Sequence, residues 1–160
     1  MMKILAALSI TMVLVSCQSM KSIETSPNCT VWMDQEYLGP YSTEVVEKNA
    51  TWAGTCRTAS SYNCRKVNVS YDENNNVFKD GIIIGKIEKN KFTYTEKSSV
   101  DNLIVYTSVH VYPDLKKIMA SVITGDKNAE TEYQYNDKCS VEQATVGAIA
   151  LGLIAQVQKL

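Results

Sequence analysis

The chain has 160 residues, a length that suits one domain. Sixteen Lys and Arg residues stand against 17 Asp and Glu residues, and the formal net charge is −1 at pH 7. Its basic residues form neither a long run nor a stripe, so the composition argues against nucleic acid as a partner.

The first 16 residues have the pattern of a secretory signal peptide. Met1-Met2-Lys3 is a short basic start, and residues 4–15 are apolar except for Ser9 and Thr11. The run is shorter than the roughly 20 apolar residues that span a membrane. The alternative, a buried N-terminal helix, is disfavoured because the segment is not amphipathic. We therefore expect residues 1–16 to be removed.

The end of this segment, Leu14-Val15-Ser16-Cys17, resembles the lipobox of bacterial lipoproteins. The resemblance implies that Cys17 is acylated, becomes the new N-terminus and anchors the protein in a membrane through lipid. Gln18 in place of Asp implies the outer membrane of a Gram-negative envelope, facing the periplasm. Residues 17–28 would then be a lipidated tether. The alternative is ordinary cleavage nearby, which would release a soluble secreted protein.

Four cysteines remain if Cys17 carries lipid, and four suit two disulfides in an oxidising compartment. Three pairings are possible. We favour Cys56–Cys64, which closes a local loop, and Cys29–Cys139, which ties the start of the domain to its end. A zinc site is disfavoured because no cysteine pair has C-x-x-C spacing and His110 is the single histidine.

Residues 29–139 are expected to form an antiparallel β domain. The first part predicts a short strand at 30–33, a turn at Gly39-Pro40 and one or two turns of helix over 42–48, with Ser42 or Thr43 as cap. From Thr51 the hydrophobic pattern has period two, which is typical of strands with one buried face. Further strands are predicted around residues 66–72, 77–88, 91–97, 102–112, 115–124 and 129–136.

About seven strands joined by short turns predict an antiparallel up-and-down meander that curls into a half-barrel or small barrel. Trp52-Ala53-Gly54-Thr55 is loosely similar to the Trp/Gly opening of lipocalins. That resemblance implies an interior that takes a small apolar ligand.

Residues 140–160 predict a C-terminal helix packed on the sheet, which makes the fold class mainly β with one helix (α+β). Ser140 and Gln143 have capping-box spacing. One face carries apolar residues at helical spacing and is a core face: Val146, Ile149, Ala150, Leu153, Val157 and Leu160. The opposite face is made of small residues, which either are buried in the same domain or receive a second partner: Ala144, Gly147, Ala148, Gly152 and Ala155.

The sequence singles out no catalytic residue, no metal ligands and no cofactor motif. His110 lacks a nucleophile or carboxylate at matched spacing. Four aromatic residues are candidates for lining a ligand: Tyr71, Phe92, Tyr94 and Tyr133. We expect a lipid-anchored, non-catalytic binding protein of the cell envelope, with an unidentified apolar ligand. The alternative is an envelope interaction, assembly or inhibitor protein that acts through a strand edge or the C-terminal helix.

Overall fold

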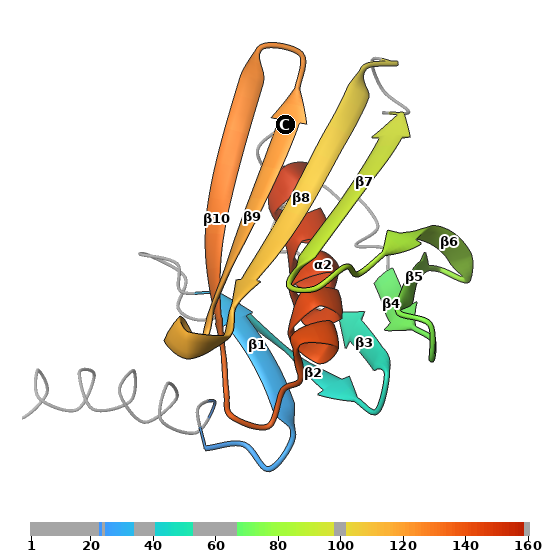
Figure 1. Ribbon diagram of the computed structural model, residues 1–160. Helices are drawn as coiled ribbons and strands as arrows, with labels where there is room; N and C mark the ends of the chain where they lie inside the picture. Colours follow the sequence, from blue (N-terminus) through green and yellow to red (C-terminus); the bar gives the residue numbers. More distant parts are fainter. Residues whose placement is uncertain (1–22, 24, 34–40, 53–66, 98–101, 159–160) are drawn as a thin grey trace, which may run out of the picture.

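The computed structural model describes residue 23 and residues 25–33, 41–52, 67–97 and 102–158. These residues form ten strands, one 3₁₀ turn and one long helix, α2 (Figure 1). The strands are β1 (Cys29–Met33), β2 (Tyr41–Val46), β3 (Asn49–Trp52), β4 (Val67–Tyr71), β5 (Asn76–Lys79), β6 (Ile82–Lys86), β7 (Lys91–Lys97), β8 (Ile104–Tyr112), β9 (Lys117–Thr124) and β10 (Lys127–Tyr135). The 3₁₀ turn η1 (Pro113–Leu115) joins β8 to β9, and α2 is Val141–Gln158.

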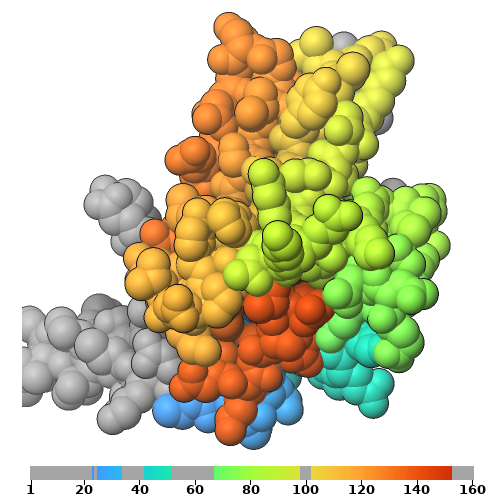
Figure 2. All heavy atoms as spheres, in the orientation of Figure 1, coloured from blue at the N-terminus to red at the C-terminus, as the bar shows by residue number. Residues whose placement is uncertain are grey.

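The ten strands form one antiparallel sheet, in the order β6-β5-β4-β3-β2-β1-β10-β9-β8-β7. Strands that follow one another in the chain are neighbours, except β6 and β7, and β1 pairs with β10. The sheet is therefore a nearly closed barrel of lipocalin-like shape, whose two unpaired edges belong to β6 and β7. Strands β7 to β10 project beyond the wider part that holds the other strands and the start of α2 (Figures 1 and 2). We call the projecting part the upper end.

Buried and more exposed residues alternate along the strands, which gives the sheet an inner and an outer face. In β8, Val105, Thr107, Val109 and Val111 are buried, while the residues between them are half-buried or exposed. The same pattern runs through β7 and β10. Because strand side chains alternate between two faces, these buried positions point into the barrel. The predicted fold class, mainly β with one C-terminal helix, is confirmed.

Helix α2 lies inside the barrel. Every residue from Ala144 to Leu151 is buried, and eight successive residues cover all sides of an α-helix. The small-residue side packs closely on the sheet, since a Cβ at Gly147 would lie 2.5 Å from Cγ2 of Val31. The capping box is present: Gln143 N donates to Ser140 Oγ at 3.1 Å, and Ser140 N donates to Gln143 Oε1 at 3.0 Å. Among the described residues, no helix is long and apolar enough to cross a membrane.

Three expectations about the strands are wrong. Residues 42–48 do not form a helix: β2 occupies Tyr41–Val46, with Thr43 and Val45 buried on alternate positions. Residues 77–88 form two strands rather than one, because Asp80 and Gly81 both take positive φ and turn the chain back. The count is therefore ten strands instead of about seven. The alternation predicted for residues 129–136 puts Asn136 on the same solvent-exposed face as Glu130 and Glu132, but Asn136 is 5% exposed because β10 ends at Tyr135.

Candidate functional site

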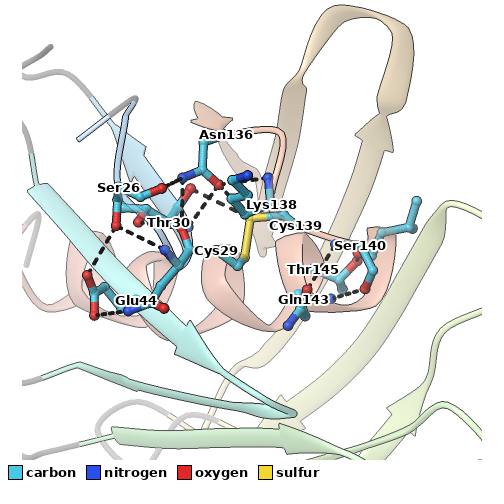
Figure 3. The surroundings of a disulfide bond; sticks show 12 residues. Ser26, Cys29, Thr30, Glu44, Asn136, Lys138, Cys139, Ser140, Gln143 and Thr145 are labelled. Carbon is cyan, nitrogen blue, oxygen red and sulfur yellow. Dashed lines mark hydrogen bonds between the residues drawn. A yellow bond between two sulfur atoms is a disulfide. The ribbon is translucent and has the colours of Figure 1, made fainter. Parts of the chain in front are cut away.

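The predicted disulfide Cys29–Cys139 is present and joins the start of β1 to the segment before α2 (Figure 3). Its Cα atoms are 4.5 Å apart, within the range that a disulfide requires. Beside it, Asn136 binds both main-chain groups of Thr30: Oδ1 accepts from Thr30 N at 3.2 Å, and Asn136 N donates to Thr30 O at 3.2 Å. This cluster fixes β1 against β10 at the lower end of the barrel.

Three of the four candidate ligand-lining residues lie in the barrel interior. Phe92 and Tyr94 are buried on the inner face of β7, with their ring centroids 5.6 Å apart. Tyr133 is buried on β10, and its hydroxyl would lie 3.0 Å from a Cβ added at Gly152 of α2. Tyr71 is only half-buried, at the end of β4, where the Lys48 ammonium sits 5.8 Å from its ring centroid.

Tyr94 belongs to an inner row that crosses four strands. Its Cα partner on β8 is Thr107, which pairs with Val122 of β9, and Val122 pairs with Ala129 of β10. Thr107 is 8% exposed, and its hydroxyl has no hydrogen-bond partner among the described residues. The sequence alternation already places Thr107 on the apolar face of its strand, which is the signal that could have identified it. It was not among the predicted site residues.

An ion pair lies next to this row. Glu96, two residues after Tyr94 on the same face, accepts from Lys79 Nζ at 3.0 Å. Lys79 is on β5 and Glu96 on β7, so the pair crosses the gap in the sheet beside β6. Burial and, after it, the negative charge of Glu96 together raise the pKa of Tyr94 to about 12. The Thr107 side chain acts in the opposite direction and lowers the pKa of Tyr94, because its oxygen lies close to the Tyr94 hydroxyl. The Thr107 and Tyr94 hydroxyls do not, however, meet the distance and angle criteria of a normal hydrogen bond.

The outer face of the upper strands carries a different set of side chains. Tyr106, His110 and Tyr112 point outward from β8, and the rings of His110 and Tyr112 are 4.4 Å apart. A shallow depression beside Tyr106 has neutral walls. His110 is thus an exposed strand residue, whose cross-strand partners are Lys91 of β7 and Met119 of β9.

Several predicted site residues lie outside the described residues, namely Cys17, Cys56 and Cys64. The acylation of Cys17 and the pairing of Cys56 with Cys64 therefore remain predictions. Within the described part of the chain, no three His, Cys, Asp or Glu side chains are grouped as metal ligands.

The chain was compared with protein-family models, with curated proteins and with solved structures, and no match was found in any of them. The barrel and its interior are therefore the basis for a functional assignment.

Proposed function

We propose that this protein is a non-catalytic binding protein of the cell envelope, which holds a small apolar ligand inside the upper end of its barrel. The observation that carries the proposal is the row of Tyr94 and Thr107, two polar side chains on the inner face of β7 and β8. Helix α2 fills the barrel along Ala144–Leu151. Clefts lined by apolar and aromatic side chains with a few polar groups are typical of small-molecule sites.

The lipid anchor is part of the same proposal and rests on the sequence Leu14-Val15-Ser16-Cys17. Acyl chains on Cys17 would hold the domain at the periplasmic face of the outer membrane. The test is Cys17→Ser, which should leave an unprocessed precursor that does not label with palmitate. If this variant matures and labels, the anchor is not at Cys17.

Ligand binding is tested by native mass spectrometry of the protein purified from its own envelope. The spectrum reports lipid mass, disulfide number and any retained small molecule together. A retained molecule of a few hundred daltons supports the ligand binder, whereas a protein subunit supports the second candidate below. A chain that carries neither, and that also fails to bind apolar fluorescent probes, argues against the proposal.

The second candidate is a protein-interaction role, which the unpaired edges of β6 and β7 favour. Ile82 and Ile83 of β6 are 69% and 57% exposed, and β6 is an edge strand of the described sheet. An extended segment of another protein can add a strand to such an edge. Replacing Ile83 by Lys should abolish a co-purifying subunit in this case and should leave small-molecule binding unchanged.

A further inference from the structure

The outer face of the projecting strands β7 to β10 has an uncharged and partly apolar centre. Tyr106 of β8 and Ile123 of β9 are cross-strand partners and are 53% and 43% exposed. Ile104, two residues before Tyr106 on the same face, is 50% exposed. The outward positions around these three carry only uncharged polar side chains: Thr93, Thr95, Ser108, Ser121 and Asn128. We call this set of residues the outer patch. Adjoining exposed apolar side chains of this kind mark interaction surfaces.

The charges on the two sides of the outer patch are opposite in sign. On the β7 side the next outward residues are Lys91 and Lys97, and on the β10 side they are Glu130 and Glu132. Glu132 is paired with Lys117 at 2.9 Å. Lys91 and Glu130 form no ion pair with any residue that the structure describes. The face is therefore basic along one side, uncharged in its centre and acidic along the other side.

A face with this charge pattern is complementary to a second copy of itself. Consider a two-fold axis in the plane of contact that runs parallel to the strands, between β8 and β9. It lays β7 of one copy over β10 of the other, and β8 over β9, so Lys91 faces Glu130 and Glu132 of the second copy. Tyr106 likewise faces the second copy's Ile123. Each contact occurs twice, as in other isologous dimers, and two aligned sheets pack about 10 Å apart in this way.

The relief of the outer patch agrees with this arrangement. A shallow depression lies beside Tyr106, and it is lined by Thr93, Thr95, Ser108 and Ser121 as well as by Ile123. The same two-fold axis places the exposed Ile123 of the second copy over this depression. An aliphatic side chain that enters it would be removed from water on both sides of the contact, which favours association.

The area of the outer patch is small for an interface. Four strands about 4.8 Å apart, each contributing about seven residues at about 3.4 Å, give roughly 450 Å² of face for each copy. Two such faces bury less than the roughly 1,200–2,000 Å² of a stable complex. The contact therefore suits a reversible dimer that dissociates on dilution. A membrane surface is a poorer partner, because Glu130 and Glu132 would lie against its anionic headgroups.

We infer that the outer patch is the interface of a homodimer, in which two copies of this chain dock face to face with Lys91 of each copy against Glu130 and Glu132 of the other. This inference does not depend on the proposed ligand, and it uses a surface other than the edge of β6.

The test uses the full chain in a mild detergent, present in large excess so that two chains do not share a micelle. Native mass spectrometry then measures monomer and dimer as the protein concentration is raised. Lys91→Glu and Glu130→Lys each place like charges at both rim contacts of a homodimer, whereas a mixed dimer of the two variants restores opposite charges. Ile123→Lys places a charge in the centre of the patch. Ile83→Lys is the matched control, because Ile83 is a 57% exposed isoleucine on β6, outside the patch.

We expect the unsubstituted chain to dimerise with a Kd in the micromolar range. Lys91→Glu alone, Glu130→Lys alone and Ile123→Lys should each raise this Kd at least about tenfold, because they introduce like-charge contacts or an unpaired charge in the interface. Ile83→Lys should leave the Kd within about twofold. An equimolar mixture of Lys91→Glu and Glu130→Lys should form mixed dimers, which are identified by mass when one variant is labelled with heavy nitrogen. Urea denaturation should give similar midpoints for all variants, since every substituted side chain is exposed.

Four outcomes overturn the inference. The first is a chain that stays monomeric up to about 100 µM, and the second is a dimer that persists in Ile123→Lys. The third is a mixture of the two charge variants that forms no mixed dimer, which would exclude the paired charges and hence the two-fold arrangement. The fourth is a monomer that carries a different subunit and loses it in Ile123→Lys, which would assign the patch to another protein.

Discussion

The side-chain amide of Asn136 donates a hydrogen bond of 2.8 Å to the main-chain oxygen of Asn28, 108 residues earlier in the chain. The same side chain accepts from Thr30 N at 3.2 Å through its oxygen. One buried carboxamide thus continues the pairing of β1 beyond the end of β10, where the strand ladder itself has stopped (Figure 3).

Replacing Asn136 by Ala should lower the free energy of unfolding by about 1–3 kcal/mol, because Thr30 N loses its partner in a buried setting and Asn28 O loses one in a partly buried setting. Asn128→Ala is the matched control, since Asn128 is exposed and its side-chain oxygen accepts from Ser121 Oγ at 3.1 Å on the surface. It should change stability by less than about 0.5 kcal/mol. Urea denaturation measures both, and equal effects would contradict the structural role of Asn136.

Replacing Gly147 by Ala should destabilise the protein by about 1–3 kcal/mol, although alanine favours helix formation. The added Cβ would lie 2.5 Å from Val31 Cγ2 and 3.2 Å from Val45 Cγ2. Val31→Ala should offset much of this loss when it is combined with Gly147→Ala, so a double-mutant cycle should give a favourable coupling energy. If the effects of the two substitutions simply add, or if Gly147→Ala is more stable than the unsubstituted chain, Gly147 does not pack against Val31 and α2 lies elsewhere.

Removing the disulfide by Cys29→Ala with Cys139→Ala should lower stability by about 5 kcal/mol in the chain-entropy model, because the two cysteines are 110 residues apart. Peptide mapping without reductant should recover Cys29 joined to Cys139. Any further loss of stability that reductant causes in the double variant would report a second disulfide, for which Cys56–Cys64 is the prediction. A peptide that joins Cys29 to Cys56 would contradict the structure.

Alkaline pH should destabilise the fold through its buried tyrosines. Burial raises the pKa of Tyr94 to about 12 and also raises the pKa values of Tyr133 and Tyr135. Because the folded state keeps these protons while the unfolded state releases them near pH 10, stability is constant below about pH 9 and falls as the pH rises from 10 toward 12.

Tyr94→Phe isolates one contribution to this pH dependence. For Tyr94 the loss is of the order of 2 kcal/mol by pH 12. The phenylalanine variant should show a shallower decline in unfolding free energy between pH 9 and pH 11 than the unsubstituted chain. Parallel curves would show that Tyr94 is accessible to solvent.

The fold class was predictable because local pattern and tertiary structure agree over most strands. The alternation in residues 129–135 marks Tyr133 and Tyr135 as inner residues, and both are buried. The Ser140–Gln143 capping box is visible in the sequence and present in the structure. Such local signals predict the structure correctly here because short turns keep neighbouring strands together.

The remaining features depend on contacts between distant segments. Residues 42–48 contain helix-capping residues, but pairing with β1 along five positions makes Tyr41–Val46 a strand. Hydrogen bonds between Asn136 and Thr30 of β1 likewise bury Asn136, although the local alternation of residues 129–136 predicts an exposed position. Of the interior site, Phe92, Tyr94 and Tyr133 were predicted, whereas Thr107 and the Lys79–Glu96 pair become visible only when β5, β7 and β8 are placed side by side.

The bond between Cys29 and Cys139 also sets the route that a mechanical load takes through the molecule. A pull between the N-terminal segment and α2 would pass from Cys29 through the two sulfur atoms to Cys139, and residues 30–138 would carry none of it. At 3.3–3.6 Å for each extended residue, residues 30–138 correspond to about 360–400 Å of chain, which the disulfide shields from the applied force. A chain tethered at its N-terminus and held at its helix would therefore keep its barrel intact under tension and lengthen fully only after reduction.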